Sequence, residues 1–227
     1  MNRLSLYLSR TGRNHKGSTT RFLLLSLSTM AALLLTTLNV NADDEALYGP
    51  KAPPGSAFIR IFNSSQAAML TASIGSKTLT AEGVYSASEY QFLPAGEYTL
   101  NLKQSQQPLV LEAGHYYTAY LNKSGAISTI EGQAFSQRKK ALIAFYNLTD
   151  APLTLKTDNG KGTVIKGVDS NNSGFREVNA VKISLAVFNE QKKIASASPI
   201  ALKRGEIFNL FAISQPNAHP SLVWVQE

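Results

Sequence analysis

The stretch Phe58-Ile-Arg-Ile-Phe-Asn-Ser-Ser-Gln-Ala-Ala-Met-Leu70 decides the fold, because the chain repeats its pattern as Leu142-Ile-Ala-Phe-Tyr-Asn-Leu-Thr-Asp-Ala-Pro-Leu-Thr154. Each copy runs apolar residues into an aromatic–Asn pair, then a polar turn, then a new apolar start. A second pair of matching blocks follows, Pro108–Tyr120 and Pro199–Phe211. The chain therefore contains an internal duplication.

The spacing of the copies indicates what kind of unit is repeated. The offset is 84 residues from Phe62 to Tyr146 and 91 residues from Gly114 to Gly205. Solenoid repeats recur at roughly 20–50 residues, so this offset is too long for a stacked array. It matches the size of one small domain. We expect the seven extra residues of the second copy to enlarge the loop Gly167–Gly174.

Apolar and polar residues alternate along both copies, which is typical of half-buried strands. Tyr98, Leu100 and Leu102 alternate with polar residues in this way, and short polar or Gly-containing turns separate such segments. We expect strands at 57–63, 69–74, 88–93, 98–102, 108–111, 116–121, 126–130, 141–147, 153–157, 163–166, 175–178, 181–188, 199–202 and 207–214. The predicted fold is all-β, with two tandem β-sandwich domains of immunoglobulin-like or jelly-roll-like type.

Residues 1–42 have the three parts of a secretory signal peptide. Five basic residues precede an uncharged stretch from Phe22 to Leu38, and Val40-Asn41-Ala42 has the small–x–small pattern of a cleavage site. An uncleaved membrane anchor is the alternative, but three Thr and two Ser dilute the apolar stretch. We expect cleavage between Ala42 and Asp43. With no cysteine in the chain, this signal fits the periplasm of a Gram-negative bacterium.

The mature chain divides into four further segments. We predict a Pro/Gly-rich extended leader over 43–55, an N-terminal sandwich over 56–134, a basic linker over 135–140 and a C-terminal sandwich over 141–227. The whole chain has a net charge of +7, but the mature part holds 17 Lys and Arg against 15 Asp and Glu. Most of the basic excess thus belongs to the signal peptide, which argues against a nucleic-acid partner.

Candidate catalytic groups are few. His115 lies just after Gly114, where the other copy has Glu206, so a structural role at a strand entry is the simpler interpretation. Gly167-Val168-Asp169-Ser170 is similar to the Gly-Asp-Ser block of SGNH esterases, but Val168 interrupts it and no Asp-x-x-His pattern surrounds His219. The sequence predicts no catalytic set, no metal site and no cofactor.

The remaining candidates are contact residues. Arg138-Lys139-Lys140 is either a solvated linker or a contact for a polyanion. The tyrosines and Trp224 could stack against sugar rings, although alternating strands should turn about half of them into the core.

Two features resemble one known family. They are the segment Ala46-Leu-Tyr48-Gly-Pro50-Lys-Ala-Pro-Pro-Gly55 with the strand behind it, and the duplicated layout with Leu93-Pro-Ala-Gly-Glu-Tyr98 before a strand. Together they are similar to AlgF, the periplasmic alginate O-acetylation protein, across residues 43–227. The leader is the most specific part of this resemblance, and it makes Tyr48 and Pro50 candidate contacts beside Arg138, Lys139 and Lys140.

The resemblance implies a non-catalytic adaptor or scaffold needed for O-acetylation of mannuronate residues in alginate. Its implied partners are a membrane-bound O-acyltransferase and SGNH-type acetyltransferases, with the alginate polymer as a further candidate. Two alternatives stay open at this point: a pair of carbohydrate-binding modules that hold the alginate chain, and an acetyl carrier.

Overall fold

The computed structural model describes residues 52–215 and 218–225, and every regular element among them is a β-strand. The predicted signal peptide, its cleavage site and most of the leader lie outside the described residues. Within the described ranges, no helix is long and apolar enough to cross a membrane. The prediction of an all-β chain is confirmed.

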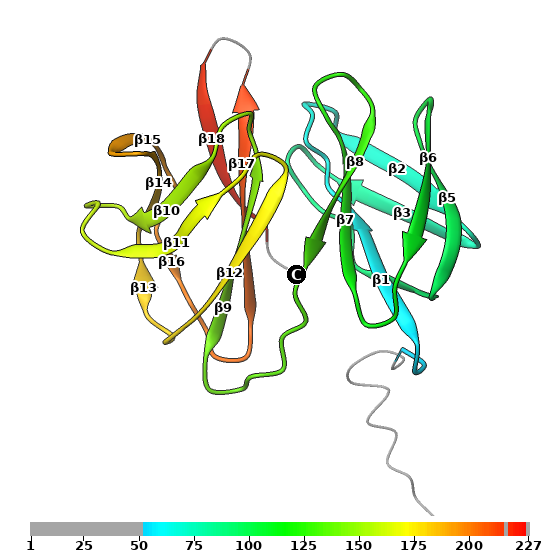
Figure 1. Ribbon diagram of the computed structural model, residues 1–227, viewed down its shortest axis with the longest axis horizontal. Coiled ribbons are helices and arrows are strands. Elements are labelled where there is room, and N and C mark those ends of the chain that lie inside the picture. The colour runs from blue at the N-terminus through cyan, green and yellow to red at the C-terminus, as the bar shows by residue number, and fades with distance from the viewer. Residues whose placement is uncertain (1–51, 216–217, 226–227) are drawn as a thin grey trace, which may run out of the picture. The chain divides into compact units, whose positions relative to one another are not determined.

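The N-terminal sandwich packs two four-stranded sheets face to face (Figure 1). One sheet has the order β4-β1-β7-β8 and the other β3-β2-β5-β6. Their bounds are β1 (Ser56–Ile61), β2 (Met69–Ile74), β3 (Lys77–Glu82), β4 (Gln91–Pro94), β5 (Gly96–Leu102), β6 (Ser105–Leu111), β7 (Tyr116–Leu121) and β8 (Ile127–Gly132).

The C-terminal sandwich repeats this topology. Its sheets have the orders β12-β9-β17-β18 and β11-β10-β14-β15, with a small additional pair, β13-β16. The bounds are β9 (Ala141–Leu148), β10 (Leu153–Thr157), β11 (Thr163–Val168), β12 (Asn172–Val178), β13 (Lys182–Ile183), β14 (Leu185–Asn189), β15 (Lys192–Ser196), β16 (Ile200–Ala201), β17 (Ile207–Gln215) and β18 (Ala218–Val225). Two tandem copies of one sandwich are therefore present.

The same unusual pairing occurs at equivalent places in both copies. β1 pairs with β7 in parallel, with Arg60 opposite Thr118, and β9 pairs with β17 in parallel, with Ala144 opposite Asn209. The other pairings between strands of these sheets are antiparallel. Shared topology and shared parallel register show that the sequence repeat is a repeat of structure.

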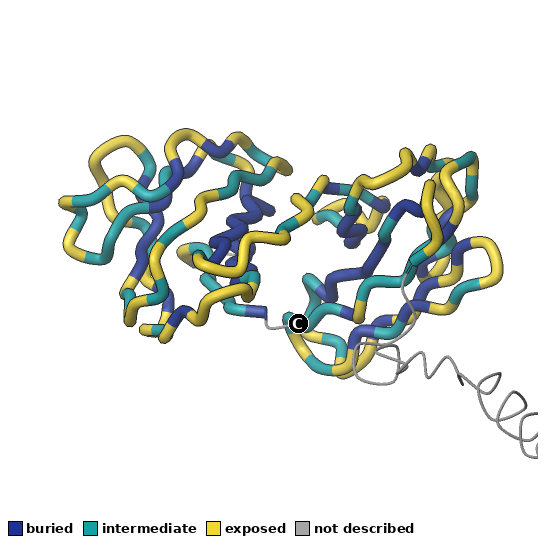
Figure 2. Tube along the Cα trace, turned by 90° about the horizontal axis from the view of Figure 1, so that it is seen from below, coloured by how far each residue is buried: buried dark blue, intermediate teal, exposed yellow. Residues whose placement is uncertain are grey.

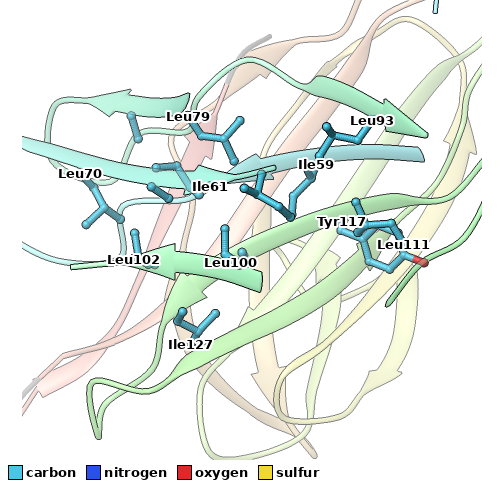
Figure 3. Packing of buried hydrophobic residues seen from close by; sticks show 14 of the residues in the cluster. Ile59, Ile61, Leu70, Leu79, Leu93, Leu100, Leu102, Leu111, Tyr117 and Ile127 are labelled. Carbon is cyan, nitrogen blue, oxygen red and sulfur yellow. The ribbon is translucent and has the colours of Figure 1, made fainter. Parts of the chain in front are cut away.

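Each sandwich has its own apolar core between its sheets. In the first, side chains such as Ile59, Leu79 and Leu100 meet from opposite sheets (Figure 3). In the second, Phe145, Leu155 and Leu210 belong to the equivalent cluster, and the buried runs along these inner strands stand out in Figure 2. Burial of each such side chain stabilises the folded state by roughly 1.5–3 kcal/mol. Because the chain has no cysteine, each copy depends on its hydrophobic core and not on disulfides.

The asparagine of the repeated aromatic–Asn pair clamps the turn that follows it. Asn147 Nδ2 donates to the carbonyls of Ala151 (2.8 Å) and Val168 (2.9 Å), and its Oδ1 accepts from Thr149 N and Oγ1. Asn63 makes the same set of contacts, to Ala67, Gly83 and Ser65. Both side chains are fully buried. The repeated pair thus ties the first strand of each copy to two loops.

Three strands were not predicted: β3, β15 and β18. All three lie at the edge of a sheet. The paired lysines of β15 weaken its alternation, and Pro220 interrupts the pattern of β18. β3 does alternate, with Leu79 and Ala81 buried, but two apolar residues are a short signal. The predicted strand over 181–188 is also interrupted, because Ser184 separates β13 from β14.

The prediction that the loop Gly167–Gly174 holds the seven extra residues is wrong. β11 extends to Val168 and β12 begins at Asn172. In the first copy Ile59 pairs with Gln91, and in the second copy the equivalent Ile143 pairs with Arg176. The offset from Gln91 to Arg176 is therefore still only 85 residues. It is 87 at the left-handed turn residues Lys103 and Glu190, and 91 at Gly114 and Gly205. Most of the extra residues therefore lie in the β14–β15 hairpin and the segment after it.

The two sandwiches pack through equivalent faces. A third apolar cluster joins Phe62 and Tyr120 of the first copy to Tyr146 and Phe211 of the second. Phe62 is equivalent to Tyr146 and Tyr120 to Phe211 in the two offsets above. The Phe211 ring stacks on Phe62 with centroids 4.0 Å apart and on Tyr146 at 4.5 Å. The outer face of the parallel strand pair is buried in both copies.

Arg60 lies in the middle of this interface and is fully buried. Its Nε donates to Thr118 Oγ1 at 3.0 Å, and its Nη2 donates to Asn209 Oδ1 of the other sandwich at 3.1 Å. The guanidinium also lies 4.5 Å from the centroid of the Tyr90 ring. Thr118 and Asn209 are equivalent positions, so one arginine bridges the same site of both copies. The second copy has Ala144 in place of Arg60, and its small side chain is buried in the same cluster.

We predict that Asn147→Ala destabilises the chain by roughly 2–4 kcal/mol, because buried carbonyls and a buried amide lose their partners together. Chemical denaturation of the mature protein measures this. The exposed Asn172→Ala is the control and should change the unfolding free energy by less than about 0.5 kcal/mol. Equal effects of the two substitutions would contradict the clamp.

We predict that Arg60→Ala destabilises the chain by roughly 2–4 kcal/mol and separates the unfolding of the two sandwiches, because a cavity and unpaired buried acceptors replace the bridge. Differential scanning calorimetry should show one transition for the parent chain and two for the variant. The exposed Arg176→Ala should retain one transition. A single, unshifted transition for Arg60→Ala would refute the role given to Arg60.

Candidate functional site

Three of the five predicted contact residues lie on the described chain, in the linker between β8 and β9. Arg138 and Lys139 are exposed, and Lys140 is partly exposed with its Nζ donating to Asn179 Oδ1 at 2.6 Å. The other two, Tyr48 and Pro50, lie outside the described residues.

The fold gathers further basic residues beside the linker. Gly205 N donates to the carbonyl of Lys140 at 2.7 Å, which places the turn between β16 and β17 against the end of the linker. Lys203 and Arg204 are exposed on that turn. Lys182 on β13 pairs with Ala201 on β16, close to the same turn. Figure 1 shows the linker and this turn at one end of the C-terminal sandwich. We call this set the basic end: Arg138, Lys139, Lys140, Lys182, Lys203 and Arg204.

The equivalent turn of the first copy has the same backbone but lacks the two cations. Gly114 and Gly205 both have a φ of 80°, a left-handed conformation that favours glycine. Gly114 N donates to the carbonyl of Ser56, as Gly205 N donates to that of Lys140. Around these glycines, Glu112-Ala-Gly-His115 in the first copy corresponds to Lys203-Arg-Gly-Glu206 in the second.

Both turns place an acidic and a basic side chain three residues apart, in the opposite order along the chain. His115 Nε2 lies 3.7 Å from Glu112 Oε2, whereas Lys203 Nζ lies 3.4 Å from Glu206 Oε1. The basic character is thus specific to the second copy and is not required by the turn itself.

The two sandwiches differ in charge as a whole. Residues 52–132 hold four Lys and Arg against five Asp and Glu, and one of those cations, Arg60, is buried in the interface. Residues 141–227 hold nine Lys and Arg against seven Asp and Glu, a net charge of +2, and the linker adds three further cations at 138–140. A field of this kind attracts anionic partners toward the linker and the C-terminal sandwich.

A hollow of about 400 Å³ adjoins the basic end. Phe135 of the linker, Ile207 and Phe208 supply apolar lining, and Lys203 and Glu206 supply charged groups. The lining of this hollow is more polar than apolar, and Phe208 is almost fully buried in the core of the sandwich.

A second hollow, of about 530 Å³, lies beside the interface between the sandwiches. Two polar contacts cross the interface here: Tyr120 Oη donates to Asn171 Oδ1 at 2.6 Å, and Lys123 pairs with Asp150. Burial raises the pKa of the Tyr120 phenol. Asn122 Oδ1 accepts from Ser124 and Ala126 within its own turn. The polar lining of this hollow therefore mainly stabilises the interface and its turns.

The candidate catalytic residues do not form a reactive arrangement in the described ranges. His115 contacts the carboxylates of Glu112 and Glu131, the latter at 3.8 Å, and both contacts are exposed. Ser170 Oγ donates to the carbonyl of Thr149 at 2.5 Å, and His219 is an exposed residue of β18. Over 52–215 and 218–225, no three His, Cys, Asp or Glu side chains are grouped to hold a metal ion.

Lys182, Lys203 and Arg204 were missed as candidates at the sequence level. Lys203 and Arg204 could have been found from the sequence repeat, because alignment of the two Gly turns places them opposite Glu112 and Ala113. The position of Lys182 beside them depends on the β13–β16 pairing and could not be read from spacing.

Comparison with known proteins gives a consistent result. A family profile described as "Alginate O-acetyl transferase AlgF" matches residues 24–209. Proteins named alginate biosynthesis protein AlgF are 38% identical in Pseudomonas fluorescens (92% of this chain, 95% of that protein) and 40% identical in Azotobacter vinelandii (82% and 84%). The Pseudomonas aeruginosa protein of that name is 36% identical, over 88% of this chain and 92% of its own length.

Among solved structures, the C-terminal domain of AlgF from P. aeruginosa matches with 39% identity and a TM-score of 0.36, covering 39% of this chain and 99% of that domain. The N-terminal domain of the same protein matches with 28% identity and a TM-score of 0.31, covering 37% and 100%. Since the profile covers most of the chain and the relatives align over most of their own length, the chain belongs to the AlgF family of alginate biosynthesis proteins.

Proposed function

We propose that this protein is a non-catalytic adaptor of alginate O-acetylation in the periplasm. In this role it holds a membrane-bound O-acyltransferase and SGNH-type acetyltransferases in one assembly during polymer synthesis. The family description refers to acetyl transfer, and the proposal assigns the chemistry itself to the partners. The signal-peptide pattern of residues 1–42 supports the location.

The observation that carries the proposal is the packing of the two sandwiches through equivalent buried faces. The Phe62–Phe211–Tyr146 stack and the Arg60 bridge join the copies directly. Burying one equivalent face of each copy leaves the remaining surfaces, which differ in charge, on a single joined body. An adaptor needs two different surfaces at a fixed separation.

The polar residues of the repeated motif have structural roles. Asn63, Asn147 and Thr149 are buried and hydrogen-bonded within their loops, and Ser170 donates to a backbone carbonyl. An acetyl carrier would need an activated nucleophile. These side chains instead hold turns together.

We expect a strain that lacks this gene to make alginate with strongly reduced acetyl content, because the transferases lose their common scaffold. Acetyl groups on purified polymer are measured by proton NMR, with the unmodified gene supplied in trans as the control. Polymer with full acetyl content from the deletion strain would refute the proposal.

We expect the variants Ser170→Ala, His115→Gln and His219→Gln, each supplied in trans, to restore acetyl content to within about twofold of the parent level, since none removes a buried packing group. The level of each variant in the cell is measured alongside. Loss of acetylation by Ser170→Ala at normal protein level would instead indicate covalent chemistry at that hydroxyl.

A further inference from the structure

We propose that the free edge of β3 in the N-terminal sandwich binds an extended, cation-bearing segment of a partner protein, which adds to the sheet as a further strand. This inference rests on the adaptor proposal and deepens it, because it gives one of the partner enzymes a place on the surface. In strand addition, backbone hydrogen bonds supply the affinity, and side chains select which segment fits.

The backbone of β3 is paired on one side only, because β3 is the last strand of its sheet. Gly83 N donates to the carbonyl of Ala68 at 2.7 Å, and the register continues from there with Leu70 opposite Ala81. In an antiparallel ladder, pairs that exchange hydrogen bonds alternate with pairs whose backbone groups point away from each other. The residues whose N–H and C=O groups point away from β2 are therefore Thr78, Thr80 and Glu82.

A hollow of about 390 Å³ opens along this same edge. Its lining includes Thr78, Thr80 and Glu82 on one side and residues of the segment 87–91 on the other. Leu79 also borders the hollow, but its side chain is buried in the core (Figure 3). The outward backbone groups of β3 thus lie beside open space that an added strand can enter.

The equivalent edge of the second copy, formed by β11, is closed. Gly174 of β12 lies so close to β11 that an added Cβ would be 2.5 Å from Ile165 and 2.9 Å from Val168. The pairing of β10 with β11 also shifts register twice, and Gly167 has a left-handed φ of 59°. Bulges of this kind twist an edge strand and disrupt its regular pairing. The second copy therefore offers no regular edge at this place.

In the first copy a serine replaces this close-packed glycine. Ser88 N donates to the carbonyl of Ile61 at 2.9 Å, which is the place that Gly174 has in the second copy. β4 pairs with β1 only over Gln91–Pro94, whereas β12 pairs with β9 without interruption. The interrupted pairing leaves Glu89 exposed beside the hollow. The same edge is therefore open in one copy and closed in the other.

Other sheet edges of the described chain carry features that hinder strand addition. Natural edges are protected by proline, lysine, short length or covering contacts. Pro94 ends the four-residue β4, Pro108 lies within β6 and Pro220 within β18, and β15 begins with two lysines. β8 and β12 contact each other, with Ser173 Oγ donating to a carbonyl of β8 at 2.7 Å. β3 has six residues, no proline and no register shift.

Charge indicates which kind of segment fits this edge. Glu82 and Glu89 are exposed and line the hollow, whereas Lys77 lies with its Nζ 5.1 Å from the centroid of the Phe92 ring. Lysine and arginine side chains bind carboxylates through charge-assisted hydrogen bonds, so a segment with a cation is favoured. A second copy of this chain would bring another Glu82 and Glu89 to the same edge, and like charges opposite each other are destabilising. A different protein is therefore the better occupant.

The probes are the purified SGNH-type acetyltransferase and the solubilised membrane-bound O-acyltransferase, each tested for binding to residues 43–227 by biolayer interferometry. Thr80→Pro removes an outward N–H and places a ring at the free edge, while the pairing with β2 keeps its donors. We expect this variant to bind one of the two enzymes at least about tenfold more weakly. Thr80→Val retains the N–H and should stay within about twofold of the parent chain.

A second pair of variants tests the charge without touching the backbone. Glu82→Gln with Glu89→Gln should weaken binding of the same enzyme about threefold or more, with the larger effect at low salt. The matched control, Glu97→Gln with Glu190→Gln, removes two exposed carboxylates elsewhere and should change binding less than about twofold. Thermal unfolding of every variant shows that the fold is intact.

Strand addition also predicts an alternating pattern of amide protection along β3. The N–H groups of Thr78, Thr80 and Glu82 face the free edge, whereas those of Leu79 and Ala81 are bonded to β2. Binding of the enzyme should slow hydrogen exchange at the first three amides and change the other two little. Exchange is measured residue by residue by NMR after the complex is dissociated.

Three results would overturn the inference: equal binding of both enzymes to Thr80→Pro and Thr80→Val, no added protection at the three outward amides, or a dimer of the parent chain that Thr80→Pro dissociates in sedimentation velocity. The first two leave the adaptor proposal standing, because the enzymes then bind at another surface. Failure of both enzymes to bind the parent chain would instead refute the adaptor role, and this inference with it.

Discussion

The packing of equivalent faces, with Arg60 at its centre, is the constraint on which the rest of the molecule depends. Phe62, Tyr120, Tyr146 and Phe211 occupy matching positions of the two copies and are buried against one another. A duplicated module would ordinarily present the same surfaces twice. Burial of this shared face joins the two copies and leaves their other surfaces free to diverge.

Divergence is visible where the backbone is most alike. The glycine turns before β7 and β17 share a φ of 80° and a hydrogen bond to the start of the first strand of their copy, yet Glu112 and Ala113 in one turn correspond to Lys203 and Arg204 in the other. The interface shows the same principle, because Arg60 of one copy corresponds to the small Ala144 of the other. The duplication therefore supplied a stable framework, and single positions adapted the copies to different contacts.

Much of the fold could be predicted from the sequence, because the repeat and the alternation of residues such as Tyr98, Leu100 and Leu102 depend on local patterns. Strands β3, β15 and β18 were missed because each has a short or interrupted apolar pattern: β3 has two buried apolar residues, β15 begins with two lysines, and β18 contains Pro220. The parallel pairing of β1 with β7 and the bridge from Arg60 to Asn209 join residues far apart in the chain, and no spacing rule indicates them. Of the basic end, the sequence identified the contiguous linker cations, whereas Lys182 joins them only through strand pairing.

The adaptor role that we propose requires the joined sandwiches to hold two protein partners at once. Hydrogen–deuterium exchange of the mature chain with an SGNH-type acetyltransferase, with the solubilised membrane-bound O-acyltransferase, and with both together tests this role directly. We expect each enzyme to protect amides in a different region of the surface, and both protections to persist when the two enzymes are present together. Competition of the two enzymes for one region would contradict the role.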